Sequence, residues 1–103
     1  MDMNEAKRDR LVAETRSAAS DQLRAERAAS KLTIDSVAAM AGINRKTVMR
    51  LESGESTPTV AQLAALCATY GLDIADFMAR TQERIDQAHR AFTPERDAGN
   101  VSR

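Results

Sequence analysis

The chain has 103 residues, which is enough for one domain with a single modest core. Apolar residues make up 43% of it and aromatic residues only 3%, and the shortage of glycine, proline and β-branched runs argues against a sheet. Its 15 basic and 15 acidic side chains cancel, and the single cysteine excludes an internal disulfide. We therefore predict an all-α protein.

The N-terminal part of the chain is charged and then becomes rich in alanine. Residues 1–16 form a charged extension, for which the sequence leaves open a helix or a mobile arm. Residues 17–30 contain no helix breaker and have high helix propensity. We predict a helix there, with Leu23 in the core and Ala19 and Ala28 beside it.

The next two helices are short and sharply delimited. Thr33 is a good N-cap for a helix that Gly42 ends, because glycine readily adopts the left-handed backbone of a helix C-terminus. Asn44 is a good N-cap for the following helix, which is expected to run to about Ser53 before Gly54 ends it.

A fourth helix follows a polar loop. Thr59 and Gln62 have the spacing of a capping box, and the helix that they begin is expected to run to Tyr70. Its predicted apolar side holds Val60, Leu63, Leu66, Cys67 and Tyr70.

The last predicted helix begins after Asp73, its expected cap, and continues through a C-terminal extension over residues 80–92. Residues 93–103 are polar and predict a disordered tail. The helix has a stripe at steps of three and four, which either folds back onto the domain or forms a dimer contact. The stripe consists of Met78, Thr81, Ile85, Ala88 and Phe92.

The second and third helices and the turn between them have the features of a helix-turn-helix. Two helices that cross at roughly 90–120° through a short turn need a small residue at their contact and a flexible one in the turn. Ala38 and Gly42 meet these needs. The corner is expected to be held by the apolar side chains Val37, Ile43, Val48 and Leu51.

Segment 32–54, LTIDSVAAMAGINRKTVMRLESG, resembles the Xre family, the phage-repressor-like (Cro/C1-type) helix-turn-helix. The resemblance covers about residues 20–79. It implies a compact five-helix DNA-binding domain over residues 17–79, with helical extensions at both ends, that acts as a homodimer. The matching positions are Leu32, Thr33, Ala38, Ala41, Gly42, Thr47, Glu52 and Gly54, with conservative variants at Val37, Ile43, Asn44 and Val48.

The sequence departs from the family pattern at three positions. Ile34 stands where the family commonly has a phosphate-contacting glutamine. Glu26 precedes Arg27 where an apolar residue is usual, and Lys31 replaces a common glycine. We expect the fold to persist and the first helix to pack unusually.

The resemblance implies that helix 45–53 lies in the major groove of double-stranded DNA, with its N-terminal residues facing the bases. The base-contacting candidates are Arg45, Lys46, Met49 and Arg50. The phosphate-contacting candidates are Thr33, Ser36, Asn44, Thr47 and Ser53.

Four other polar or reactive residues have structural interpretations. Glu52 lies near the C-terminal end of its helix, where a carboxylate opposes the helix dipole, so we expect an ion pair with Arg27 or another residue of the first helix. Cys67 is expected to be buried and His89 to be solvated. These residues form no set of acid, base, nucleophile or metal ligands, and we predict no metal, no cofactor and no enzyme activity.

The leading functional hypothesis is a transcription regulator, a repressor that binds a palindromic operator as a dimer with half-sites roughly 10 base pairs apart. A second hypothesis is the antitoxin of a toxin–antitoxin pair, with residues 80–103 contacting the toxin. A third is a protein–protein adaptor that does not bind DNA, which the zero net charge and Ile34 favour slightly. No stretch approaches the roughly 18 apolar residues that span a bilayer, and an apolar signal segment is lacking, so we expect a cytoplasmic protein without a membrane partner.

Overall fold

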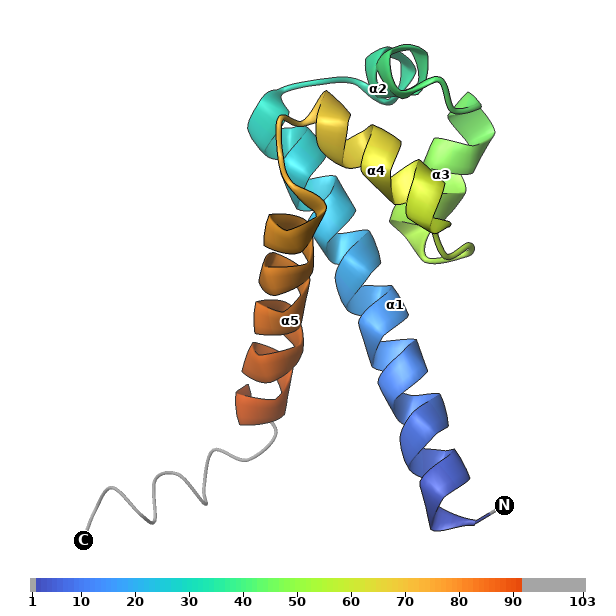
Figure 1. The fold of residues 1–103 in the computed structure, drawn as a ribbon, viewed down its shortest axis with the longest axis vertical. Coiled ribbons are helices and arrows are strands. Elements are labelled where there is room, and N and C mark those ends of the chain that lie inside the picture. Colours follow the sequence, from blue (N-terminus) through green and yellow to red (C-terminus); the bar gives the residue numbers. More distant parts are fainter. Residues whose placement is uncertain (1, 92–103) are drawn as a thin grey trace, which may run out of the picture.

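A computed structural model describes residues 2–91, which form five α-helices and no strand (Figure 1). The all-α prediction is therefore confirmed. Three expectations fall on residues that the structure does not describe: the disordered tail over 93–103, the helical position of Phe92, and the second half of the toxin contact expected over 80–103. The helices are α1 (Met3–Ser30), α2 (Ile34–Ala41), α3 (Arg45–Ser53), α4 (Val60–Thr69) and α5 (Ile74–Ala91).

Helix α1 is a single helix of 28 residues, so the charged extension is helical and continuous with the predicted first helix. The Asp2 side chain caps it by accepting a hydrogen bond from the Glu5 backbone N–H at 2.8 Å. In Figure 1 the N-terminal half of α1 runs away from α2, α3 and α4, and residues 2–13 are exposed. Residues 2–13 contribute nothing to the core, so helix propensity and the Asp2 cap account for their helical conformation.

The core lies where α2, α3 and α4 pack on the C-terminal half of α1 and the start of α5. Two predictions for it were wrong. Val60 is 78% exposed because it is the first residue of α4, and Ala28 is exposed because it lies about 140° around α1 from Leu23. The buried cluster consists of Leu23, Val37, Val48, Leu51, Leu66, Cys67 and Phe77.

The predicted helix ends agree closely with the structure. The capping box is complete, because Thr59 Oγ1 accepts from the Gln62 backbone N–H and Gln62 Oε1 accepts from the Thr59 backbone N–H, both at 3.0 Å. Lys31, at the position where the family often has glycine, takes a left-handed conformation with φ 57°. A side chain with a Cβ is strained in this region, so the turn after α1 costs about 1–2 kcal/mol more than with glycine.

Helix α5 folds back on α1 of the same chain (Figure 1). Thr81 is fully buried and Ile85 is 6% exposed, whereas Met78 and Ala88 on the same predicted stripe are exposed. Thr81 and Ile85 therefore pack within the monomer, which agrees with one of the two alternatives for half of the described stripe. None of the helices in residues 2–91 is long and apolar enough to cross a membrane.

Polar groups hold α1 and α5 together. Glu26, the departure from the family pattern, is only 7% exposed, and its Oε2 accepts from Gln22 Nε2 and Arg80 Nη1 at 2.7 Å each. Arg84 Nε in turn donates to Gln22 Oε1 at 2.6 Å. The unusual packing of the first helix thus consists of a hydrogen-bonded network whose basic members come from α5.

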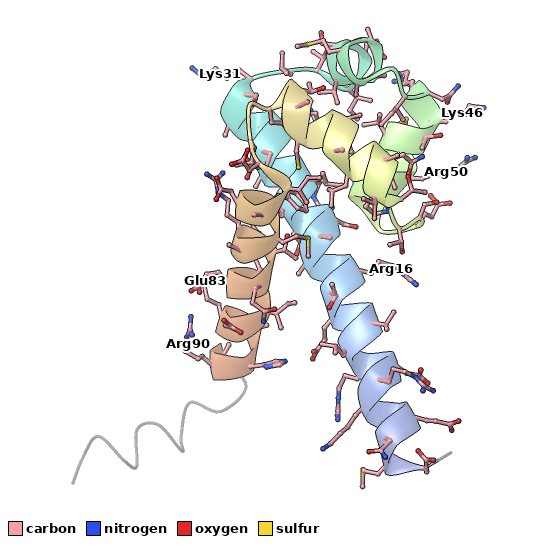
Figure 2. All side chains as sticks on the ribbon, in the orientation of Figure 1. Arg16, Lys31, Lys46, Arg50, Glu83 and Arg90 are labelled. Carbon is pink, nitrogen blue, oxygen red and sulfur yellow. The ribbon has the colours of Figure 1, made fainter. Side chains whose placement is uncertain are left out.

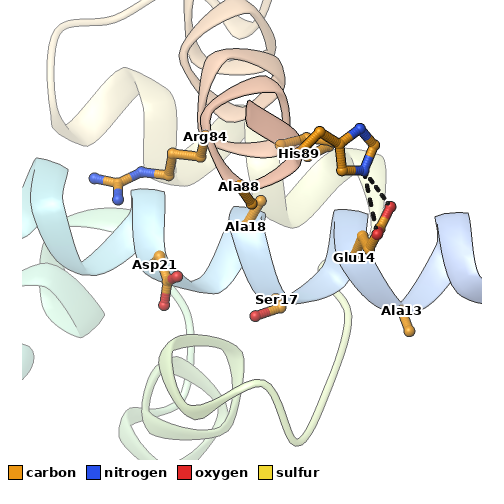
Figure 3. A pocket seen from close by; sticks show the side chains of 9 residues that line it. Ala13, Glu14, Ser17, Ala18, Asp21, Arg84, Ala88 and His89 are labelled. Atoms are coloured by element: carbon orange, nitrogen blue, oxygen red, sulfur yellow. Dashed lines mark hydrogen bonds and ion pairs between the residues drawn. The ribbon is translucent and has the colours of Figure 1, made fainter. Parts of the chain in front are cut away.

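A shallow hollow continues between the two helices beyond this network, lined by small side chains such as Ala13, Ala18 and Ala88 (Figure 3). At its open end His89 Nε2 lies 3.1 Å from Glu14 Oε1, and the His89 side chain is 58% exposed. His89 is therefore at the surface, as expected, and helps to join α5 to α1.

Tyr70, at the C-terminal end of α4, predicts a pH dependence of stability. Burial, followed by the nearby Glu52 carboxylate, raises the pKa of its phenol from 10 to about 12. The folded state thus favours the neutral phenol. The contribution of Tyr70 to stability should be constant below pH 10 and be lost between pH 10 and about 12, where the unfolded chain ionises first. Because Tyr70 is the only tyrosine in the sequence, the ultraviolet absorbance of tyrosinate measures its titration directly.

The matched control for this prediction is Tyr70→Phe. Within the described residues the buried Tyr70 hydroxyl has no hydrogen-bond partner. Removing it should leave stability near neutral pH unchanged or raise it by about 1 kcal/mol. It should also reduce the loss of stability between pH 10 and about 12. An absorbance midpoint near 10 in the folded protein would contradict the prediction.

Candidate nucleic-acid interface

The turn between α2 and α3 is tight and well anchored. Gly42 has φ 69°, a left-handed conformation that a residue with a Cβ rarely adopts. The Ile43 backbone N–H returns to the Ala38 carbonyl at 3.0 Å, which closes the C-terminal end of α2. Asn44 Oδ1 then accepts from the Lys46 backbone N–H at 2.8 Å and begins α3. Only three residues therefore separate the two helices.

Helix α3 has one buried face and one exposed face. Val48 and Leu51 are each 1% exposed and pack into the core, as predicted. The four base-contacting candidates are all exposed: Arg45, Lys46, Met49 and Arg50. Figure 2 shows the labelled side chains of Lys46 and Arg50 directed away from the body of the protein on the same side. The structure thus brings together three cations and one thioether on the accessible face of one short helix.

Arg45 is the most constrained of these side chains. Its Nε donates to Asp35 Oδ1 on α2 at 2.6 Å, and its Nη1 lies 3.4 Å from Met49 Sδ. The side chains of Arg45 and Asp35 are 59% and 75% exposed. One acidic residue therefore stands beside the cations of α3.

The five phosphate-contacting candidates are placed less uniformly. Thr33 and Ser36 are exposed at the N-terminal end of α2, where Thr33 Oγ1 accepts from the Ser36 backbone N–H at 3.1 Å. Asn44 is exposed but acts as the cap of α3, and Thr47 is half-buried. Ser53 is exposed, and its hydroxyl donates to the Arg50 carbonyl at 3.1 Å. Their phosphate contacts stay a prediction.

The expected ion pair of Glu52 is formed with Arg27. Arg27 Nε and Nη2 donate to the two carboxylate oxygens of Glu52 at 2.8 and 3.0 Å. The hydrogen bond to Glu52 raises the pKa of Arg27. Arg24 also donates to the Glu52 backbone carbonyl. The bidentate contact between Arg27 and Glu52 fixes the C-terminal half of α3 to α1. It thereby sets the position of the exposed face of α3.

Ile34, which replaces a phosphate-contacting glutamine of the family pattern, is half-buried and packs against the core. The side chain at position 34 therefore contributes to core packing in this chain.

Sequence reasoning did not select Arg16. Arg16 Nε donates to Thr57 Oγ1 in the α3–α4 loop at 2.9 Å, and Figure 2 shows Arg16 on the same side of the molecule as Lys46 and Arg50. The two bonded residues are 41 positions apart, so no local pattern in the sequence connects them.

Among residues 2–91, the possible metal ligands form no cluster and the cysteine is buried. In residues 2–91, no group of three or more His, Cys, Asp and Glu side chains is placed to hold a metal ion. Cys67 is 2% exposed, and burial raises the pKa of its thiol, which disfavours the reactive thiolate.

Comparisons with known proteins agree with this geometry. A family model described as a helix-turn-helix domain matches residues 18–79. A crystal structure of the clp gene regulator ClgR from Corynebacterium glutamicum is similar at 22% identity and a TM-score of 0.69, covering 84% of this chain and 88% of that one. A second structure of the same regulator is similar at 24% identity and a TM-score of 0.64, covering 68% of this chain and 91% of that one. At these identities the likeness shows a shared fold. No curated protein matched the sequence.

Proposed function

The chain belongs to the helix-turn-helix domain family, and from the exposed face of α3 we propose that it is a sequence-specific DNA-binding transcription regulator. More closely, we propose a member of the phage-repressor-like (Xre) type that represses transcription by binding a palindromic operator as a homodimer. The fold that this chain shares with the clp gene regulator ClgR supports a role in regulation.

The observation that carries the proposal is the composition of the exposed face of α3. Three cations project from a helix whose opposite face is locked into the core, although the whole chain has zero net charge. Arg45 and Arg50 can each donate two hydrogen bonds to guanine, and Met49 can contact a thymine methyl group. Lys46 can bind a base edge or a phosphate.

The projecting half of α1 supports the homodimer. Met3, Leu11 and Val12 are 72%, 56% and 51% exposed, and they lie beyond the part of α1 that the rest of the chain covers. A symmetric contact between two copies would remove these apolar side chains from water.

Arg45→Ala tests the base-reading role. Duplexes selected by the wild-type protein from a random library supply the specific site, and a scrambled duplex supplies the non-specific one. The variant should bind the selected site roughly 5- to 150-fold more weakly, a loss of about 1–3 kcal/mol, and should relax the preference at one base position. The matched control is Arg90→Ala, which removes the same charge from α5 on the opposite side of the molecule (Figure 2).

Several outcomes would count against parts of the proposal. An equal loss on every duplex would contradict base recognition by Arg45. Selected sites with a single half-site, bound by a monomer, would contradict the homodimer and the palindrome. No affinity for any duplex at low salt, where phosphate attraction is strongest, would contradict DNA binding and favour the adaptor hypothesis.

A further inference from the structure

We propose that Asp35 determines the base specificity of Arg45, by holding its guanidinium group in the orientation that recognises guanine. The inference rests on the proposed DNA-binding function and adds to it a positioning residue from the preceding helix. Asp35 would act through Arg45 without contacting the base itself.

The contact joins the two helices of the helix-turn-helix. Asp35 lies in the first turn of α2 and Arg45 is the first residue of α3. The 2.6 Å contact from Arg45 Nε to Asp35 Oδ1 and the 3.4 Å contact from Nη1 to Met49 Sδ hold the group from two sides. These two contacts thus hold the guanidinium at the end of α3 that is expected to face the bases.

This ion pair adds little to the stability of the fold. The two side chains are 59% and 75% exposed, and solvent-exposed ion pairs are strongly weakened by water and salt. Its main effect is on the conformations of Arg45, because a free arginine side chain has many rotamers and loses them when it binds. An arginine that is already ordered loses less conformational freedom on reaching the base.

The contact with Asp35 determines which N–H donors of the Arg45 guanidinium remain available to bind a base. A guanidinium has five N–H donors, and the contact with Asp35 uses the one on Nε. Nη1 and Nη2 carry four N–H groups, of which the contact with Met49 Sδ uses one, so three remain for a base. Guanine offers two neighbouring acceptors, O6 and N7, in the major groove, whereas adenine offers one acceptor beside a donor. A fixed end with two donors therefore favours guanine.

The negative charge of Asp35 also disfavours the binding of Arg45 to a phosphate in place of a base. An unrestrained arginine can turn to a phosphate, which binds without regard to sequence. The Asp35 carboxylate repels a phosphate that approaches the Arg45 guanidinium. Asp35 should therefore lower affinity for all DNA while it raises discrimination at one base pair.

The experiment replaces Asp35 by asparagine, which has nearly the same shape and no charge. Wild-type and D35N proteins are titrated with the selected duplex, with a duplex in which the Arg45-dependent guanine is changed, and with a scrambled duplex. The guanine position is identified beforehand by Arg45→Ala. Discrimination at that position should fall at least about 5-fold in D35N, while affinity for the scrambled duplex should rise by about 2-fold or more.

The matched control is Glu83→Gln, which removes an exposed partner of Arg90 on the opposite side of the molecule (Figure 2). It changes the net charge equally and should leave discrimination unchanged. A second measurement uses the free protein: the Nε–H signal of Arg45 in NMR should exchange slowly with water in the wild type and fast in D35N, and E83Q should not alter it.

Two results would overturn the inference alone. D35N could retain full discrimination at the guanine position, or it could discriminate more sharply, which would show that Asp35 competes with the base for Arg45. A wild-type protein with no sequence preference in the library selection would contradict the proposed function, and the inference with it. The three results are distinguished by the wild-type selection and the D35N titration together.

Discussion

Arg27→Ala is expected to lower the free energy of unfolding by about 3–5 kcal/mol, because it leaves the Glu52 carboxylate buried without its main partner. The Glu52 side chain is 7% exposed and that of Arg27 is 25% exposed, so water cannot readily replace the two hydrogen bonds that are lost. Urea unfolding followed by circular dichroism measures the change. The effect should be largest for α3, whose C-terminal half these bonds fix to α1.

Two further variants make this prediction specific. Arg27→Ala combined with Glu52→Gln should recover part of the lost stability, because a neutral amide is less costly to bury than an unpaired carboxylate. Arg90→Ala removes an arginine from an exposed pair with Glu83 and should change stability by less than about 1 kcal/mol. If Arg27→Ala lost no more than Arg90→Ala, the ion pair would not anchor α3.

Glu26→Ala should destabilise the protein by about 2–3 kcal/mol and loosen α5 in particular. The change removes the acceptor shared by Gln22 and Arg80, and the buried Gln22 amide then lacks a partner for its N–H group. Hydrogen exchange should therefore become faster along α5, where Arg80 lies, than along α3. Urea unfolding gives the total loss, and amide exchange gives its location.

The variant Glu26→Leu separates two causes of this loss of stability, the missing hydrogen bonds and the void that alanine leaves. Glu26→Leu restores the apolar character that the family pattern has there, and it leaves a smaller void than alanine. It should cost less than Glu26→Ala, while Glu83→Ala on the exposed side of α5 should cost almost nothing. Equal losses for alanine and leucine would assign the whole effect to the hydrogen bonds, and uniform exchange along α3 and α5 would contradict the link to α5.

The features predicted correctly from the sequence are local ones. A cap, a capping box or a left-handed glycine involves residues within about four positions of one another, and the turn around Gly42 belongs to this class. The two faces of α3 follow from helical periodicity alone. The Arg27–Glu52 pair is long-range, but it was anticipated because a carboxylate near a helix C-terminus needs a cation.

The features missed depend on where helices meet. Asp35 and Arg45 are 10 positions apart, and they meet only because of the angle between α2 and α3. Arg80 reaches Glu26 over 54 positions because α5 folds back on α1. The helical N-terminal half of α1 could not be distinguished from a mobile arm, because residues 2–13 are exposed and show no apolar periodicity. Its contacts through Glu14 and Arg16 are with residues far along the chain.

The packing of α5 on α1 has a consequence for how the protein is made. Synthesis proceeds from the N-terminus, so the face of α1 that α5 covers stays exposed to solvent until α5 has been translated. That face consists largely of Ala18, Gln22 and Glu26, which are small or polar side chains. An apolar face of the same extent would invite aggregation of the unfinished chain. Because this face is polar, α1 of the nascent chain should resist aggregation until α5 has been synthesised and packs on it.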